Sequence, residues 1–493
     1  MIIVSAASEV APFAKTGGLA DVTGSLPAAL QKNGHQVLTF LPRYRSVDIK
    51  KHKLSIVIDQ LEVPLGRERF KARIYRQVSA PGLEFYFVDQ PDFFQRDELY
   101  GTSISDYPDN DRRFTFFQRA LMETLVALDI RPDVIHCHDW QTGLIPAYLK
   151  TIYAKTPIFS KTKSVFTIHN LAYQGNFPPD SLPITGISWE EFRMEKLEFY
   201  GKVSFLKGGL VYADALTTVS ERYGREIQTE EFGCGMDKVL THRKGRIFGI
   251  VNGIDNEEWN PETDSDLASP FSAADPSNKK ASKAALQKQE DMDLLPEAPL
   301  LGVVSRLIDQ KGIDILVASL DAIAQMGCQF VLLGTGDEKY HHVLREYGRR
   351  HRRRFGIHIV FDPKMAKQIY AGCDMLLVPS YYEPCGLAHL IAMRYGTIPV
   401  VRATGGLADT VAEYNPATGK GNGFSFEAYK SEALVSAIQR AAAVYRDKQA
   451  WQALVQNAMS CDFSWDASAR KYLDVYERLL KESSGTRGKG SKS

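Results

Sequence analysis

The chain has 493 residues, which exceeds the length at which one hydrophobic core usually stops growing, so two globular domains are expected. Hydrophobic residues make up 44% of it and charged residues 24%, which excludes the disordered and fibrous classes. The formal net charge of +1 gives no electrostatic reason to expect nucleic acid or an anionic membrane as a partner. Six scattered cysteines and the lack of an apolar run of membrane-spanning length predict a cytoplasmic protein with no membrane partner.

Short β-branched runs alternate with amphipathic stretches in the amino-terminal half, a pattern typical of parallel βαβ units. The expected elements are, in chain order, a strand at 1–7, a glycine turn at 17–18, a helix that stops at 34, and strands at 35–42, 133–138, 164–169 and 215–220. This half, residues 1–253, is therefore predicted to be one Rossmann-like domain with a doubly wound parallel sheet.

A stretch rich in Pro, Ser, Asp and Lys follows Asn260, and a second alternating series begins after it. Its expected elements are strands at 300–306, 329–337, 357–361, 374–380 and 397–406, and a helix at 313–323. We expect a second Rossmann-like domain over 254–460, a helix over 461–482 that crosses back to the first domain, and a disordered tail over 483–493. Two such sheets predict a ligand in a central cleft that the carboxyl ends of their strands face.

The hexapeptide TGGLAD occurs twice, at residues 16–21 and 404–409. Each copy follows an expected strand and precedes an expected helix. Consecutive glycines let backbone approach a ligand, and the N–H groups of a first helical turn attract phosphate. Lys15 adds a positive charge to the first copy. A tight turn beside a solvated lysine is the alternative for one copy alone, but the repetition favours anion binding in both domains.

Charged side chains follow several of the expected strands. Arg306 and Lys311 are two cations that suit a diphosphate leaving group, although each could also be simply solvated. Glu383 lies near a helix N-terminus, where a carboxylate can equally be a cap. Asp139 and His169 come just after strand ends in the first domain. Neighbouring histidines beside Asp139 suggest zinc, but the sequence shows no second ligand set, so no metal site is predicted.

Together these residues resemble the bacterial glycogen synthase and plant starch synthase family, retaining glucosyltransferases of the GT-B fold. The similarity extends over nearly the whole chain. The matching motifs are KTGGL at 15–19, HDWQTG with Asp139, TIHNLAYQG with His169, VNGID with Asn252, SRLIDQKG with Arg306 and Lys311, EPCGL with Glu383, and TGGL at 404–407.

The resemblance implies transfer of glucose from ADP-glucose to the nonreducing 4-hydroxyl of an α-1,4-glucan, without a metal or other cofactor. It implies contacts to the transferred glucose from Glu383, His169 and Asp139. It also implies a set of donor-binding residues, namely Lys15, Gly18, Asn252, Arg306, Lys311, Thr404, Gly405, Gly406 and Leu407. Many retaining GT-B enzymes carry a second glutamate eight residues after the first, whereas this chain has Ile391, as glycogen and starch synthases do.

The sequence is also compatible with three other functions. A retaining GT-B transferase that uses UDP-glucose or builds short oligosaccharides would share most of these motifs. A noncatalytic glucan-binding homologue would keep the fold, although the intact Lys15, Arg306, Lys311 and Glu383 disfavour it. A dinucleotide-dependent oxidoreductase is disfavoured because G-x-G-x-x-G is missing from the first strand-to-helix turn. Oligomeric state, primer requirement and the choice between glycogen and starch are not predicted.

Overall fold

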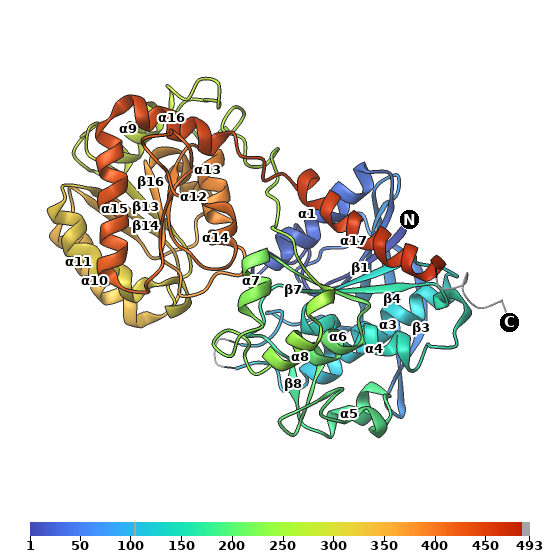
Figure 1. Ribbon diagram of the computed structural model, residues 1–493. Helices are drawn as coiled ribbons and strands as arrows, with labels where there is room; N and C mark the ends of the chain where they lie inside the picture. Colours follow the sequence, from blue (N-terminus) through green and yellow to red (C-terminus); the bar gives the residue numbers. More distant parts are fainter. Residues whose placement is uncertain (103–104, 486–493) are drawn as a thin grey trace. The chain divides into compact units, whose positions relative to one another are not determined.

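The computed structural model describes residues 1–102 and 105–485, and the chain forms two compact units (Figure 1). Of the described residues, the first unit contains 1–102, 105–219, 224–253 and 465–485. The second contains residues 220–223 and 254–464. The carboxyl-terminal helix α17 (Trp465–Gly485) thus belongs to the first unit and extends beyond the expected end at 482. Of the tail predicted at 483–493, residues 486–493 lie outside the described residues.

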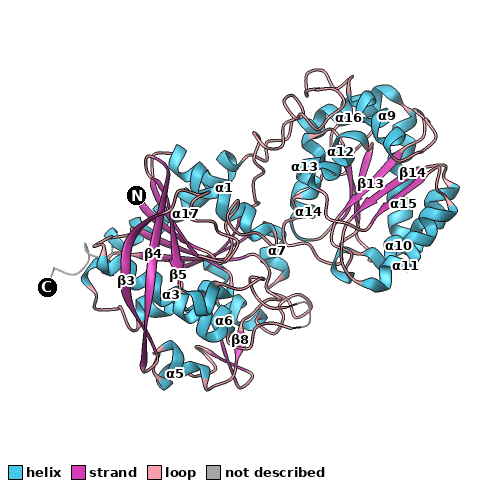
Figure 2. Cartoon of the chain, turned by 180° about the vertical axis from the view of Figure 1, so that it is seen from behind, coloured by secondary structure: helices cyan, strands magenta, loops and turns pink. Residues whose placement is uncertain are grey.

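A nine-stranded sheet is the framework of the first unit, in the order β12-β11-β7-β6-β1-β2-β5-β4-β3. Its strands are β1 (Ile2–Ala6), β2 (Gln36–Pro42), β3 (Ser55–Leu65), β4 (Glu68–Ala80), β5 (Leu83–Asp89), β6 (Val134–His138), β7 (Lys163–Ile168), β11 (Ala215–Thr218) and β12 (Ile247–Gly249). The central strands pair in parallel, whereas β3 and β4 form an antiparallel hairpin at one edge, visible as the longest strands in Figure 2. The sequence did not predict this hairpin.

Helices cover both faces of this sheet, which explains why β6 is buried at every residue. Helices α1 (Gly18–Lys32) and α17 pack together on one face, and α3 (Asn110–Ala127), α4 (Leu144–Lys150) and α6 (Phe205–Tyr212) lie on the other (Figure 1). The shorter helices are α2 (Pro91–Phe94), α5 (Ser181–Thr185), α7 (Glu221–Glu226) and α8 (Asp237–His242). A small antiparallel sheet joins β8 (Asn176–Phe177), β10 (Lys202–Ser204) and β9 (Glu198–Phe199).

The second unit contains six parallel strands in the order β15-β14-β13-β16-β17-β18. They are β13 (Leu300–Val304), β14 (Gln329–Leu333), β15 (Phe355–His358), β16 (Met375–Val378), β17 (Ile398–Arg402) and β18 (Phe424–Phe426). The strand expected at 357–361 therefore lies earlier, and Phe361 is an exposed loop residue. This sheet is doubly wound, as predicted, and β13 lies inside it between β14 and β16.

Two layers of helices enclose the second sheet (Figure 2). One layer contains α10 (Ile313–Gln325), α11 (Glu338–Arg350) and α15 (Ser431–Arg446). The other contains α9 (Lys279–Gln289), α12 (Pro363–Gly372), α13 (Ala388–Arg394) and α16 (Lys448–Met459). Helix α14 (Gly405–Thr410) follows β17 directly. None of the helices in the described residues is long and apolar enough to span a membrane.

Two of the passages of the chain between the units, at 253–254 and at 464–465, are hydrogen-bonded to each other. The N–H of Ile254 donates to the carbonyl of Phe463 at 2.8 Å, and Ile254 pairs in parallel with Ser464. The hydroxyl of Ser468, in the first turn of α17, donates to the carbonyl of Val251 at 2.7 Å. The start of α17 is therefore fixed to the segment that leaves the first unit.

Candidate active site

Asp139 and His169 lie together at the carboxyl edge of the first sheet. They follow β6 and β7, which are parallel neighbours, so their positions are adjacent. The N–H of Asp139 donates to the carbonyl of Thr167 at 3.0 Å, and the N–H of His169 donates to Oδ1 of Asp139 at 2.8 Å. Asp139 has a φ of 57°, an unusual value for a non-glycine residue that is often found at functional sites.

The carboxyl group of Asp139 is buried, with 7% of the residue exposed. Burial raises the pKa of Asp139 to about 7, even though the N–H groups of His169 and Asn170 donate to it and favour its charged form. The negative charge of Glu9 raises this pKa further. Asp139 can therefore hold or release a proton near neutral pH.

The raised pKa of Asp139 predicts a pH-dependent stability. Between its ordinary pKa and about 7, the folded state holds a proton that the unfolded state has lost. The free energy of unfolding of the wild type, relative to Asp139→Asn, should therefore fall as pH rises towards 7, by at most about 1.4 kcal/mol per pH unit, and stay level above 7. Urea unfolding of both proteins between pH 5 and 8 measures this difference. Identical pH slopes for the two proteins would contradict the assignment.

The tilted rings of His136, His138 and His169 lie one after another at the ends of β6 and β7, and we call this group the histidine stack. The rings of His136 and His138 lie 4.1 Å apart, and Nδ1 of His138 lies 3.0 Å from Nε2 of His169. Burial lowers the pKa of His136 and of His169 to about 3, and that of His138 well below its ordinary value, so the stack is neutral. The Tyr476 hydroxyl of α17 lies 2.8 Å from Nδ1 of His136.

The histidine stack is not arranged as a metal site. Nδ1 of His138 is within hydrogen-bond distance of His169, and Nε2 of His136 lies 2.5 Å from the hydroxyl of Thr167. Both nitrogens therefore have protein partners. Across residues 1–102 and 105–485, no group of three or more His, Cys, Asp and Glu side chains is placed to hold a metal ion.

The first glycine turn is held by Glu9, a buried residue that the sequence analysis did not single out. The Glu9 carboxylate accepts the N–H of Thr16 at 2.5 Å, the hydroxyl of Thr16 at 2.7 Å and the N–H of Gly17 at 3.2 Å. Two amides expected to attract an anion thus donate to a carboxylate of the chain. Gly18 is exposed, with open space where a Cβ would lie. Lys15 is exposed and pairs with Asp21 at 2.5 Å.

Asn252 lies just before the passage from the first unit to the second. It is 6% exposed, and its Oδ1 has no hydrogen-bond partner among the described residues. Leaving a buried amide oxygen unpaired costs about 1–3 kcal/mol. Such a group is a candidate contact for a ligand, although the side chain of Asn252 makes no hydrogen bond to the other predicted site residues in the described part of the chain.

The half-buried Lys311 and the buried Glu383 form an ion pair at the carboxyl edge of the second sheet. Nζ of Lys311 lies 2.6 Å from Oε2 and 2.9 Å from Oε1 of Glu383. Ser380, in the loop after β16, donates its hydroxyl to Oε2 at 2.9 Å. Lys311 is the last residue of the 3-10 turn Asp309–Lys311, which follows β13 and precedes α10. Glu383 lies in the loop after β16. Because β13 and β16 are parallel neighbours, these two segments lie side by side and supply the two charges of the pair.

Burial alone would raise the pKa of Glu383, but the opposite charge of Lys311 and the hydrogen bonds from Lys311 and Ser380 lower it overall. The carboxylate therefore stays ionised at neutral pH. Because its pKa is lowered in the folded state, its contribution to stability is present above the ordinary pKa and is lost as pH falls through the lowered one. Glu383 is suited to accept hydrogen bonds and is not suited to donate a proton.

The second glycine turn packs against the Glu383 loop. Gly405 has a φ of +46°, and a Cβ on it would lie 1.9 Å from the carbonyl oxygen of Glu383. The N–H of Gly406 donates to that same carbonyl at 3.1 Å, and a Cβ there would meet Cys385 at 2.3 Å. Glycine is therefore required at both positions, because the backbone at Glu383 and Cys385 lies too close for a side chain. The contact between the turn and this loop holds Glu383 in place.

The remaining predicted residues of this turn are buried. Thr404 is the N-cap of α14, and its N–H donates to the carbonyl of Arg402 at 2.9 Å. The N–H of Leu407 donates to the carbonyl of Thr404 at 3.1 Å, while its side chain packs in an apolar cluster with Val401 and Val411. Arg306 follows β13 and is exposed, so its guanidinium is accessible to a ligand.

The structure thus brings together Asp139 and His169 in the first unit, and Lys311, Glu383, Gly405 and Gly406 in the second. Sequence reasoning missed the supporting residues Glu9, Ser380 and His389. Ser380 is the last residue of the strand expected at 374–380, and a polar residue at a strand end could have indicated a site residue. His389 is buried on α13, with Nε2 2.6 Å from the hydroxyl of Thr410. Glu9 lies in an apolar opening segment, and no sequence pattern pointed to the turn that it holds.

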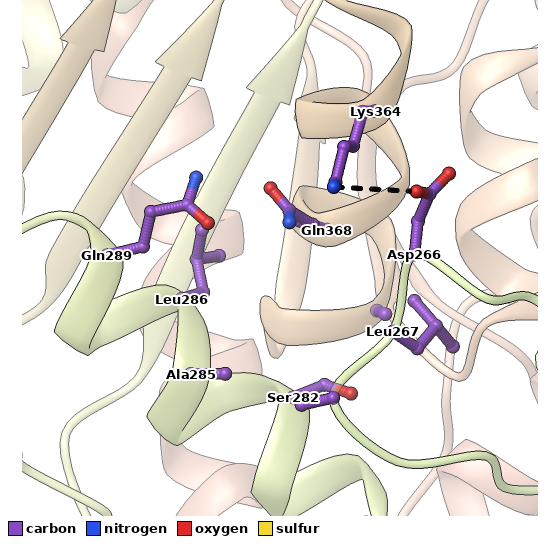
Figure 3. A pocket seen from close by; sticks show the side chains of 10 residues that line it. Asp266, Leu267, Ser282, Ala285, Leu286, Gln289, Lys364 and Gln368 are labelled. Atoms are coloured by element: carbon purple, nitrogen blue, oxygen red, sulfur yellow. Dashed lines mark ion pairs between the residues drawn. The ribbon is translucent and has the colours of Figure 1, made fainter.

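A separate pocket of about 190 Å³ lies between α9, α12 and the loop at 266–268 of the second unit (Figure 3). Ser282, Gln289 and Gln368 line it, and Lys364 and Asp266 approach within 3.8 Å across its rim. None of the predicted site residues lines this pocket.

Two family models match the chain. One, described as the starch synthase catalytic domain, matches residues 2–242. The other, described as glycosyl transferases group 1, matches residues 287–458. Each match falls largely within one unit and contains one of the two groups of site residues, except that Asn252 lies between the matches.

Relatives and solved structures align along almost the full chain. A glycogen synthase from Geotalea daltonii is 47% identical over 97% of this chain and 99% of its own length, and one from Koribacter versatilis is 46% identical over 97% and 98%. The catalytic domain of starch synthase IV from Arabidopsis thaliana, bound to ADP and acarbose, has a TM-score of 0.88 at 34% identity, covering 97% of this chain and 99% of that one. A sucrose-phosphate synthase from Thermosynechococcus elongatus, at 18% identity and a TM-score of 0.59 over 98% and 99%, shares the fold.

Proposed function

Because the chain belongs to the glycogen synthase family of GT-B glycosyltransferases, we propose that it transfers glucose from ADP-glucose to the nonreducing 4-hydroxyl of an α-1,4-glucan, with retention of configuration. The observation that supports this reaction most is the ion pair between Lys311 and the buried Glu383. A sugar nucleotide needs a cation to bind its diphosphate and a carboxylate to accept hydrogen bonds from its sugar hydroxyls. Lys311 and Glu383 provide these two groups side by side.

The proposed step needs no second carboxylate. The bond between C1 of glucose and the phosphate oxygen breaks, and a bond from C1 to O4 of the acceptor forms on the same face. The acceptor proton passes to the departing phosphate oxygen. Arg306 and Lys311 stabilise the charge that develops on the diphosphate, so no metal or other cofactor is required. Ile391, where other retaining enzymes have a glutamate, is an apolar residue with 6% exposure.

The first unit supplies contacts to the transferred glucose in this proposal. His169, neutral and within 3.0 Å of His138, can hydrogen-bond a sugar hydroxyl, and Asp139 accepts or donates according to its protonation. Lys15 would exchange Asp21 for the donor, and the open backbone at Gly18 lets the donor approach. Thr404 to Leu407 and Asn252 complete the proposed donor contacts.

A comparison of donors tests this proposal. We expect label from ADP-glucose to enter glycogen faster than label from UDP-glucose, by about 10-fold or more in kcat/KM. The rate should persist in excess EDTA, because cations of the chain replace a metal. Equal or better transfer from UDP-glucose would favour the UDP-glucose alternative. Glycogen binding without transfer from either donor would favour a noncatalytic glucan-binding protein.

We propose a cytoplasmic location, where both a sugar nucleotide and a glucan are accessible. The six cysteines, all of them in the described residues, are free thiols, which suits a reducing compartment. Recovery of the intact protein with the membrane fraction of the producing cells would contradict this location.

A further inference from the structure

A tyrosine occupies the tip of the β9–β10 hairpin in a left-handed conformation. Phe199 pairs with Lys202, which leaves a two-residue turn of Tyr200 and Gly201 with φ values of 47° and 75°. Turns of this kind strongly favour Asn-Gly, since a bulky residue at positive φ is strained. Tyr200 is nevertheless present and is 82% exposed. Its side chain gains no burial that would offset the strain, which suggests that it contacts something outside the chain.

The hairpin tip is supported by the loop at Cys234 and Gly235. A Cβ on Gly235 would lie 3.1 Å from Cζ of Phe199 and 3.4 Å from Cε2 of Tyr200, so this glycine leaves room for the two rings. The rings of Phe199 and Tyr200 contact edge to face at 4.7 Å. Tyr200 is thus held from one side while most of its surface stays open.

The same loop connects the hairpin to the His169 segment. The amide of Gln174 donates to the carbonyl of Cys234 at 2.9 Å, and the next strand, β8, pairs with β10 through Asn176 and Ser204. Tyr173, directly before Gln174, is 54% exposed. It lies four residues after His169, so their Cα atoms are at most about 14 Å apart. Two exposed tyrosines therefore lie in one small sheet and its loops, and Tyr173 is the one within this distance of His169.

We propose that Tyr173 and Tyr200 form a stacking platform for an α-1,4-glucan acceptor, beyond the sugar that reacts. This inference rests on the proposed function. A tyrosine ring offers an apolar face to the C–H groups of a sugar and a hydroxyl to its polar edge. Two polar residues, the half-buried Gln174 and the exposed Lys202, are close in sequence to the two tyrosines, so the surface suits a hydroxylated chain better than an apolar protein partner.

The closing experiment compares Tyr200→Asn with Tyr200→Phe. Asparagine is favoured at positive φ, so Tyr200→Asn should keep or raise the Tm while it removes the ring. We expect KM for glycogen to rise about 3–10-fold in Tyr200→Asn and to stay within twofold in Tyr200→Phe. With maltose, too short to extend far beyond the reacting sugar, both variants should match the wild type. Tyr173→Ala should raise KM for glycogen in the same way.

Three outcomes would overturn the platform. One is an unchanged KM for glycogen in Tyr200→Asn, and another is an equal rise for maltose and glycogen. The third is a wild-type dimer that becomes monomeric in Tyr200→Asn without a change in KM, because the tyrosines would then contact a second copy of the chain. Affinity electrophoresis through glycogen measures binding without turnover. If glycogen slows the migration of the wild type but the protein transfers no glucose, the proposed reaction is disproved. The platform is then tested by the migration of Tyr200→Asn, which glycogen should slow less than that of the wild type.

Discussion

Replacement of Lys311 by alanine is expected to slow glucosyl transfer by a factor of about 100–1,000, the usual loss when one group that stabilises transition-state charge is removed. It should also destabilise the fold by about 3–5 kcal/mol, because the buried carboxylate of Glu383 loses the partner that lies 2.6 Å away. Single-turnover rates with ADP-glucose and glycogen, together with urea unfolding, measure the two effects.

Arg306→Ala is the matched control for Lys311→Ala. Arg306 is exposed, so its loss should reduce the rate by a similar factor of about 100–1,000 and change stability by no more than about 0.5 kcal/mol. The double variant Lys311→Met with Glu383→Gln should recover much of the lost stability, since no buried charge remains, but not the rate. Near-normal turnover in Arg306→Ala or Lys311→Ala would disprove the role of these cations, and near-normal turnover in Glu383→Gln would remove Glu383 from the chemistry.

Replacement of Gly405 by alanine is expected to destabilise the second unit by about 4 kcal/mol or more. The new Cβ would lie 1.9 Å from a backbone oxygen of Glu383, and the backbone at φ +46° is strained for any side chain. Both the turn and the Glu383 loop must move, so the surviving folded protein should also lose activity. Thermal and urea unfolding of the purified variant measure the loss.

Gly18→Ala is the natural control, because Gly18 lies in the first copy of the repeated hexapeptide TGGLAD and Gly405 lies in the second. Open space surrounds its Cβ, so stability should change by less than about 0.5 kcal/mol. KM for ADP-glucose should rise if the donor approaches this backbone. A variant Gly405→Ala as stable as Gly18→Ala would contradict the close approach described for the second turn.

Periodic, apolar segments were predictable from the sequence. The strands at 133–138 and 164–169, with polar residues directly after them, correctly indicated a parallel sheet. The β3–β4 hairpin was not predictable in this way, because it is an exposed antiparallel edge without a helix between its strands. The strand at β15 was misplaced because apolar Val360 and Phe361 continue its pattern into an exposed loop.

The two copies of TGGLAD show most clearly where local sequence stops being informative. In the first copy the glycines are exposed, and Glu9, seven residues before Thr16, binds the turn. In the second copy the glycines are buried against the Glu383 loop. Six identical residues thus have different surroundings, which are set by segments elsewhere in the chain. Repetition correctly drew attention to both turns, but the contacts of each depend on tertiary structure.

The placement of α17 also fixes the order in which the protein can be completed on the ribosome. This helix packs on α1 and brings Tyr476 to His136, yet it is the last described segment to be translated. At roughly 5–20 residues per second, residues 254–464 take on the order of 10–40 s to synthesise. During that interval residues 254–464 can fold, whereas the face of the first sheet that α1 covers still lacks α17. The unit translated first is therefore the one finished last.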